Sequence, residues 1–205
     1  MNLSKNSRTF STNDSKWAVS SVRCVEDDTP VNPEELDSVM IDPRDSSVYK
    51  IVVIGKQVWM AENMRYTDST ITSRCHTDAD TCAMFGRFYN WSTAMNICLE
   101  GWRLPTQSDW TTLNTTIGGT PYAMQAKGFE AWPNATDAYG FTALPASIDG
   151  YTSFYGLPNN SVTLFWSSSE YDTNHAYYWK LYPEKSELDH YWDKSMYFSV
   201  RCIRN

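Results

Sequence analysis

The sequence has no run of about 20 apolar residues, so none of its segments is suited to cross a bilayer as a helix. It is also poor in positive charge, because 17 Lys and Arg stand against 24 Asp and Glu, a net charge of −7. Nucleic acid and anionic membrane surfaces both attract surplus positive charge, so this balance argues against either as a partner. The first residues contain no hydrophobic stretch typical of a secretory signal, and for an exported protein we expect that signal to be removed or upstream.

Signals for catalysis and for zinc binding are missing as well. There is no Gly-x-Ser-x-Gly motif and no Cys-x-x-Cys pair, and the three histidines (His76, His175 and His190) do not neighbour a candidate nucleophile. We therefore do not expect an enzyme. Aromatic residues, in contrast, reach 15% of the chain, with 9 Trp and 13 Tyr, which can fill a core or line a binding face.

Five cysteines are present. Cys75 and Cys82 enclose six residues, among them a histidine and two aspartates, so a metal site is the alternative to a disulfide. The disulfide is favoured because no other Cys/His cluster supplies further zinc ligands. Cys98 and Cys202 then remain as a second pair, and Cys24 has no partner in the chain. An odd cysteine in an exported protein suggests a bond to something outside the chain.

The tetrapeptide Ser-Val-Arg-Cys occurs twice, at residues 21–24 and 199–202. In each copy the cysteine lies eight positions after a lysine, Lys16 or Lys194. The repeat predicts that residues 1–28 are an arm resembling the closing strand of a preceding or neighbouring domain. Trp17, Val22 and Cys24 would make its contact with that neighbour. A proline-containing linker, residues 29–41, would join the arm to a domain over residues 42–205.

Hydrophobic periodicity predicts the elements of that domain. The expected strands are a hairpin of residues 48–54 and 57–60, and then residues 163–168, 175–182 and 196–203. One helix would bury Phe88, Trp91, Met95 and Cys98, and a second would start at a capping box formed by Thr106 and Asp109 and bury Trp110, Leu113 and Ile117. A short third helix is expected near residues 122–127, and a long irregular loop over residues 128–163. This order predicts an α+β fold with two main helices packed on a small mixed or antiparallel sheet.

Seven sequence blocks together resemble the Fibrobacter succinogenes major paralogous domain, a family of exported bacterial modules. The blocks are Asp42-Pro43-Arg44-Asp45, Trp59-Met60-Ala61-Glu62-Asn63, Gly86-Arg87-Phe88-Tyr89, Gly101-Trp102-Arg103-Leu104-Pro105-Thr106, residues 139–145, residues 165–170 and residues 198–202. The resemblance covers residues 42–205 and implies a C-type-lectin-like fold, a surface or secreted location and no established activity. It also implies both cysteine pairings, and residues 16–25 resemble the family's closing strand.

A calcium site is a weak further hypothesis. Glu170, Asp172 and Asn174 could offer oxygen ligands in the style of a calcium loop. The Glu-Pro-Asn and Trp-Asn-Asp tripeptides with which true C-type lectins hold calcium and sugar are absent, so a solvated turn is the favoured interpretation and no cofactor is expected.

The block from Arg103 to Trp110 is also similar to formylglycine-generating enzymes, which share the lectin-like fold. Those enzymes need a reactive cysteine pair near the end of the chain, where this sequence has only Cys202. An oxidase of this type is therefore the least favoured function.

Exposed aromatic residues are the preferred ligand-binding candidates. We expect Tyr151, Tyr155, Tyr191 and Trp192 to lie on the surface, while some of Tyr177, Tyr178 and Trp179 face the core.

The leading hypothesis is a non-catalytic module of the bacterial cell surface that acts in adhesion or assembly by binding polysaccharide or a neighbouring module of the family. The alternative is a subunit of a head-to-tail filament whose arm completes the next subunit's sheet, with Cys24 bonded to that subunit. One period of a tandem polyprotein would explain the repeat equally well.

Overall fold

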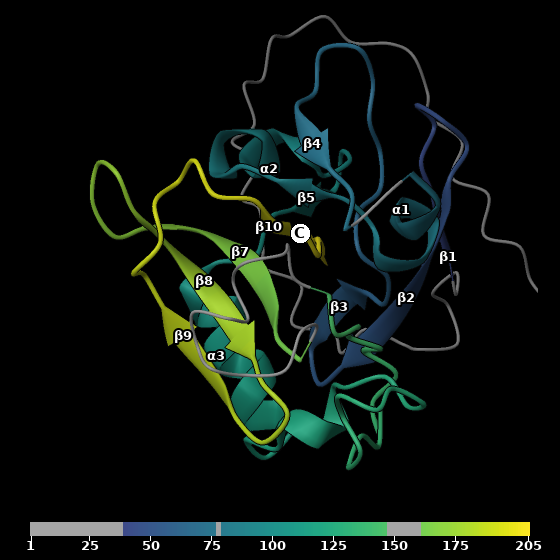
Figure 1. The fold of residues 1–205 in the computed structure, drawn as a ribbon, viewed down its shortest axis with the longest axis vertical. Coiled ribbons are helices and arrows are strands. Elements are labelled where there is room, and N and C mark those ends of the chain that lie inside the picture. The colour runs from purple at the N-terminus through teal and green to yellow at the C-terminus, as the bar shows by residue number, and fades with distance from the viewer. Residues whose placement is uncertain (1–38, 77–78, 147–160) are drawn as a thin grey trace, which may run out of the picture. The chain divides into compact units, whose positions relative to one another are not determined.

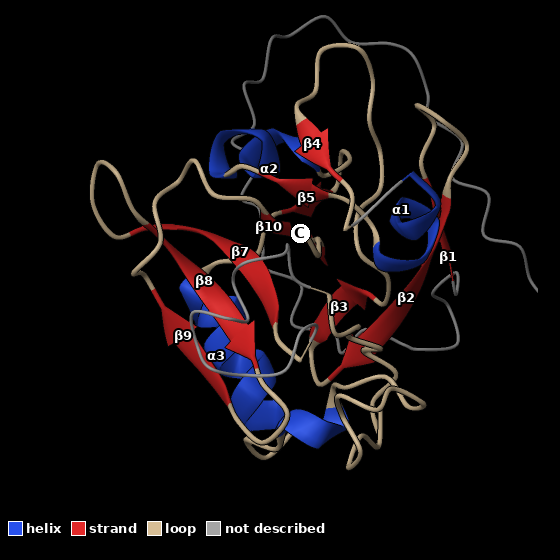
Figure 2. Cartoon of the chain, viewed as in Figure 1, coloured by secondary structure: helices blue, strands red, loops and turns tan. Residues whose placement is uncertain are grey.

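The computed structural model describes residues 39–76, 79–146 and 161–205, which all belong to one compact unit. These residues form two β-sheets and three α-helices (Figures 1 and 2). The fold is therefore α+β, as predicted, although the strands form two sheets where one was expected. The predicted arm, residues 1–28, lies outside the described residues together with Trp17, Val22 and Cys24.

The first sheet has the strand order β1-β2-β3-β11-β6, with every pairing antiparallel. Its strands are β1 (Val39–Ile41), β2 (Val48–Ile54), β3 (Gln57–Met60), β11 (Ile203–Arg204) and β6 (Trp102–Arg103). The predicted β2–β3 hairpin is confirmed, and Gly55 at its turn has a φ of 64°, which glycine adopts without steric cost. Residues 39–41 were predicted to be linker but form β1, so the ordered structure starts before Asp42.

The second sheet has the order β4-β5-β10-β7-β8-β9, in which β10 and β7 are parallel and the other neighbours antiparallel. Its strands are β4 (Ser73–Arg74), β5 (Phe88–Tyr89), β10 (Phe198–Ser199), β7 (Thr163–Glu170), β8 (Ala176–Leu181) and β9 (Ser186–Asp189). The single strand predicted over residues 196–203 is wrong: it is divided into β10 in this sheet and β11 in the other. No strand was predicted over β9.

The helices are shorter than the sequence pattern suggested. They are α1 (Ala79–Phe85), α2 (Trp91–Ile97) and α3 (Gln107–Thr116). The predicted buried stripe of α2 is wrong, because Asn90 caps the helix through a bond from the Thr93 amide and the buried face is Ala94 and Ile97. Met95, placed in that stripe, is 40% exposed. No helix in the described ranges combines the length and the apolar character that spanning a bilayer requires.

The start of α3 agrees with its prediction. Thr106 Oγ1 accepts the Asp109 amide at 3.1 Å, and Asp109 Oδ2 accepts the Thr106 amide at 2.7 Å, which forms the capping box. The predicted stripe of Trp110, Leu113 and Ile117 is buried, and α3 packs against β7 and β8. The expected third helix is only a 3₁₀ turn, Pro121–Ala123.

Aromatic residues fill two hydrophobic clusters, one on each face of β7 and β8. Trp166 and Tyr178 lie in the first cluster, and Phe165 and Trp179 in the second. In the second cluster the rings of Trp110 and Trp179 stack with centroids 6.0 Å apart and planes 9° apart. Both faces of these strands are thus buried, which accounts for much of the aromatic content.

Arg201 is fully buried between the two sheets and binds four acceptors. Its guanidinium donates to Asn63 Oδ1 at 2.6 Å and to the backbone oxygens of Met60, Phe141 and Thr142 at 3.0, 2.6 and 2.9 Å. Burial lowers the pKa of Arg201 to about 9. Since burial disfavours the charged form, these acceptors are what keeps the guanidinium in place, and they connect three separate stretches of chain.

The structure confirms both predicted disulfides. Cys75 and Cys82 close a short segment at α1, with Cα atoms 5.0 Å apart. Cys98 follows α2 and pairs with Cys202, which is buried next to Arg201, with Cα atoms 5.9 Å apart. The second disulfide joins the end of a helix to the last residues of the domain across 104 positions of sequence.

Candidate functional site

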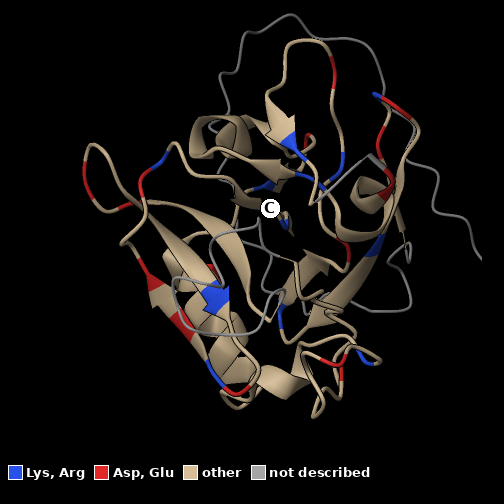
Figure 3. Ribbon diagram, viewed as in Figure 1, with Lys and Arg blue, Asp and Glu red and all other residues tan. Residues whose placement is uncertain are grey.

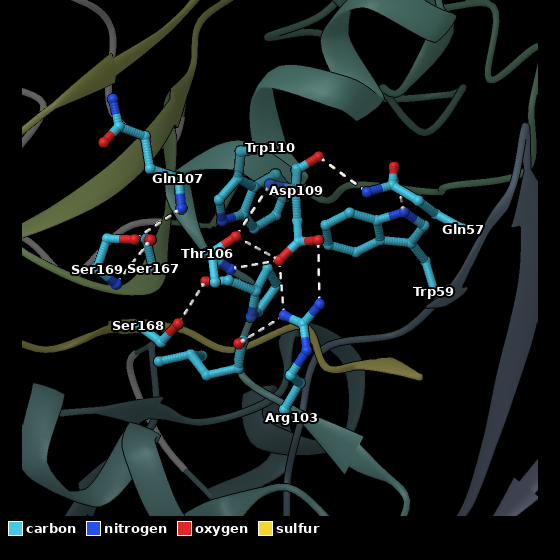
Figure 4. Close-up of polar contacts among 12 residues, drawn as sticks. Gln57, Trp59, Arg103, Thr106, Gln107, Asp109, Trp110, Ser167, Ser168 and Ser169 are labelled. Atoms are coloured by element: carbon cyan, nitrogen blue, oxygen red, sulfur yellow. Dashed lines mark hydrogen bonds and ion pairs between the residues drawn. The ribbon is translucent and has the colours of Figure 1, made fainter. Parts of the chain in front are cut away.

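Two of the sequence blocks meet at the start of α3, and their polar groups bind each other (Figure 4). Arg103 donates to both carboxylate oxygens of Asp109 at 2.6 and 3.1 Å, and the Ser168 amide donates to the Pro105 oxygen at 2.7 Å. Partial burial raises the pKa of Asp109, but hydrogen bonds from Arg103 and Thr106 lower this pKa by a larger amount, so the net shift is downward. These contacts hold β6, α3 and β7 together, and the polar groups that make them bind one another instead of lining an open site.

Five partly or largely exposed aromatic residues lie around the β7–β8 turn and after β9, and we call them together the aromatic surface: Tyr171, Tyr177, His190, Tyr191 and Trp192. The Tyr171 and His190 rings stack with centroids 3.5 Å apart and planes 4° apart, and Tyr177 meets both edge-on. Tyr191 and Trp192 lie at right angles with centroids 5.2 Å apart. Tyr171 is 51% and Tyr191 62% exposed, whereas Trp192 packs partly against the first hydrophobic cluster.

The β7–β8 turn and the segment after β9 hold this surface in place, and they lie side by side in Figure 1. Asp172 Oδ1 accepts the amides of Asn174 and His175, each at 2.8 Å, which closes the turn. Lys194 then donates its ammonium to the Asp172 and Thr173 oxygens, at 2.9 and 3.1 Å. The two segments are thus joined by hydrogen bonds from Lys194.

The margin of the aromatic surface is acidic. Figure 3 shows the carboxylates on the β7–β8 turn and on β9, with fewer cations between them. Partial desolvation raises the pKa of Asp172, but hydrogen bonds from Asn174 and His175 lower this pKa by a larger amount, and the net shift is downward. The carboxylate is therefore ionised at neutral pH, so the site carries negative charge towards any ligand.

The weak calcium candidates all make contacts within or next to the β7–β8 turn. Asp172 directs its carboxylate at His175, with Oδ1 2.8 Å from Nδ1, and Glu170 accepts from the Lys194 ammonium at 3.2 Å. The amide of Asn174 donates to Asp172. Within the described ranges, no three His, Cys, Asp or Glu residues are grouped so that they could hold a metal ion.

The ligand-binding candidates have different outcomes. Tyr191 and Trp192 belong to the aromatic surface, Trp192 less exposed than expected, while Tyr151 and Tyr155 lie outside the described residues. Sequence reasoning did not select His190, although its position next to two aromatic residues was a usable signal. Tyr178 and Trp179 are both buried, on opposite faces of β8, so two of the three consecutive aromatics face a core.

All four cysteines in the part of the chain that the structure describes are paired as disulfides. Cys202 is buried and bonded to Cys98, and Cys75 is bonded to Cys82. A pocket of about 340 Å³ is lined by Arg44, Tyr66 and Asn96. The Arg44 guanidinium already donates to Asp42, and the Tyr66 hydroxyl already donates to Asp68. The aromatic surface therefore remains the best candidate among the described residues.

Comparison with known proteins gives one match. The family model described as the Fibrobacter succinogenes major domain matches residues 52–204. No curated protein and no solved structure matches the chain. The matched segment contains both disulfides, the buried Arg201 and the aromatic surface, and covers well over half of the sequence. The chain belongs to the Fibrobacter succinogenes major domain family.

Proposed function

We propose that this chain is a non-catalytic, extracellular module of the bacterial surface that binds a glycan or another extracellular polymer. The observation that carries the proposal is the aromatic surface, with its half-exposed Tyr171 and Tyr191 rings held in fixed orientations. Sugar rings bind by stacking on such faces.

The proposed location and fold have separate support. Two disulfides fit a protein that folds in an oxidising compartment, since such bonds are rare in the cytosol. A C-type-lectin-like fold is part of the proposal on the strength of the sequence resemblance, and the α+β arrangement with paired sheets is compatible with it. The oxidised state of Cys202 supports a non-catalytic role.

The charge of the surface restricts the proposed ligand. Asp172 and Asp193 directly follow Tyr171 and Trp192 in the chain, and an anionic polymer would meet like charge there. We therefore propose a neutral polysaccharide as the ligand.

Removing the exposed rings should weaken binding to a neutral polysaccharide without affecting the fold. We expect Tyr171→Ala and Tyr191→Ala each to weaken binding by roughly tenfold, corresponding to about 1.4 kcal/mol for the loss of one stacking face. Affinity electrophoresis in gels containing cellulose derivatives or other neutral polymers measures this effect. Tyr139→Ala is the matched control, because Tyr139 is a 40% exposed tyrosine away from the aromatic surface. Retention that is equal for all four proteins, or absent for the wild type on a broad glycan array, would count against the proposal.

A second function is favoured by what the Ser-Val-Arg-Cys segment does at residues 199–202. There Ser199 lies in β10, Val200 accepts the Met64 amide at 2.9 Å, Arg201 fills the buried polar site and Cys202 forms the disulfide. Each residue type has a separate task in closing the domain. A second copy at residues 21–24 would be equipped to close a neighbouring module in the same way, and a filament built by such exchange is our alternative proposal.

The filament proposal predicts a covalent ladder. In such a filament Cys24 of one subunit would replace Cys202 as the partner of Cys98 in the next subunit, by a thiol–disulfide exchange that releases the Cys202 thiol. Native protein run on a non-reducing gel should then give a series of multimers that collapses to one band when a reductant is added, and Cys24→Ser should remove the series. Cys24 has no intramolecular partner among the four paired cysteines, which is why it is the residue to change. A single monomer band with a titratable free thiol on Cys24 would contradict the crosslink while leaving glycan binding untested by the same result.

A further inference from the structure

Lys180 is a buried lysine on β8 that faces two carboxylates on β9. It is only 5% exposed, lies directly opposite Glu187 in the strand register, and also faces Asp189 two residues further along. Its ammonium Nζ is 3.1 Å from Glu187 Oε1 and contacts Asp189 Oδ2. The Tyr182 ring, 5.6 Å from Nζ, adds an apolar wall. An amine and two acids are thus held together in a partly desolvated place.

The two oxygens of Asp189 have different surroundings. Oδ2 contacts the lysine, whereas Oδ1 accepts the backbone amides of His190 and Tyr191, at 2.7 and 3.2 Å. Two backbone N–H groups on one oxygen are the arrangement that stabilises an oxyanion while a nucleophile adds to the carbon. The other oxygen is free to leave on the side where the amine arrives.

Glu187 is placed to move protons between these groups. Its Oε1 touches Lys180 Nζ and the exposed Lys185 Nζ, at 3.1 and 3.3 Å. A carboxylate at this distance can take a proton from the amine and return it to the leaving oxygen, which is the task of a general acid–base group. Proximity supplies the rest, because groups fixed in contact react far faster than the same groups in solution.

We propose that Lys180 and Asp189 condense into an intramolecular amide that joins β8 to β9, with Glu187 as the proton carrier. The neutral amine adds to Cγ of an Asp189 carboxyl group that has received the ammonium's proton on Oδ2, and negative charge collects on Oδ1, which the two backbone amides hold. Glu187 takes a second proton from the nitrogen and delivers it to the Oδ2 hydroxyl, which leaves as water. One N–C bond forms, one C–O bond breaks, and no oxidant or cofactor is needed.

The starting state is an ion pair, which sets the expected pace. Burial raises the pKa of Asp189, but Lys180 and the amides of His190 and Tyr191 lower this pKa by a larger amount. The carboxylate is therefore mostly ionised at neutral pH. Condensation needs the rarer state in which the ammonium has passed its proton to a carboxylate. We therefore expect the amide to accumulate slowly after folding rather than at once.

Mass spectrometry tests the proposal directly, on the full chain and without reference to any ligand. After reduction of its disulfides, the wild type should be lighter than its sequence by one water molecule, before or after long incubation at neutral pH. Digestion with trypsin should yield residues 128–185 joined to residues 186–194, because Lys180 is no longer cleaved and its nitrogen is bonded to Asp189. A full-mass wild type that stays so after incubation, with normal cleavage at Lys180, overturns the proposal.

Variants separate the roles of the three residues. Asp189→Asn should form the same amide with loss of ammonia, so its crosslinked mass should equal that of the crosslinked wild type. Glu187→Gln should keep the lysine and the aspartate but retain full mass for much longer. Lys185→Arg is the matched control, because Lys185 touches Glu187 but not Asp189, and it should lose water as the wild type does. Equal rates in the wild type and Glu187→Gln would overturn the assignment of Glu187.

Discussion

Replacing Arg201 with methionine is expected to lower the free energy of unfolding by at least about 4 kcal/mol, which is a large part of the stability of an ordinary domain. Methionine has a comparable volume and carries no charge into the buried site, so lost packing is not the main cost. The cost arises because Asn63 Oδ1 and the oxygens of Met60, Phe141 and Thr142 remain buried and lose their donor. Each unsatisfied buried acceptor costs about 1–3 kcal/mol.

Urea unfolding followed by tryptophan fluorescence measures this change. Arg201→Lys should lose most of the same stability, since one ammonium cannot reach four acceptors that a planar guanidinium satisfies at once. Arg204→Met is the control, because Arg204 is exposed on the neighbouring strand β11. If Arg201→Met stays within about 1 kcal/mol of the wild type, then waters or rearranged side chains satisfy the acceptors and our account of the buried site is wrong.

Removal of the Cys98–Cys202 disulfide should cost more than removal of the Cys75–Cys82 disulfide. The two bonds close sequence separations of 104 and 7 residues. In the chain-entropy model the long loop contributes about 4.7 kcal/mol and the short loop about 2.4 kcal/mol. The long disulfide also anchors the segment that holds Arg201, so its loss should loosen the buried polar site as well.

The paired alanine variants Cys98→Ala with Cys202→Ala, and Cys75→Ala with Cys82→Ala, allow the comparison in one denaturation experiment. Each set removes two sulfurs and one bond, so the difference between them reports the loop that was closed. We expect the first pair to unfold at clearly lower urea. An equal or larger loss from the second pair would show that α1 and its short disulfide matter more to the fold than the closing segment does.

The elements that the sequence predicted correctly depend on local signals. The β2–β3 hairpin follows from Gly55 between two β-rich runs, and the start of α3 follows from Thr106 and Asp109 three residues apart. Both disulfides could be predicted because few pairings were open. Each of these features is determined by residues close in sequence or by counting, so no knowledge of the tertiary contacts was needed.

The errors occur where distant contacts decide. The sequence pattern of residues 196–203 is that of one strand. In the structure, however, Phe198 and Ser199 pair with β5 and β7, whereas Ile203 pairs with β3 and β6. Met95 fits an apolar stripe, yet the Asn90 cap and the position of α2 leave it on the surface. The stacking of His190 on Tyr171 escaped for the same reason, since the two rings meet only after the β7–β8 turn is folded and β9 is paired with β8.

The positions of β10 and β11 have a consequence for how the chain is made. Both strands are interior, β10 between β5 and β7 and β11 between β3 and β6, although they come last in the domain. During synthesis from the N-terminus, neither sheet can be completed until residues 198–204 have left the ribosome. The domain must therefore fold after translation of its whole length, with contacts between distant residues that make folding slow. A nascent chain of this kind therefore stays without its complete fold until residues 198–204 have been synthesised.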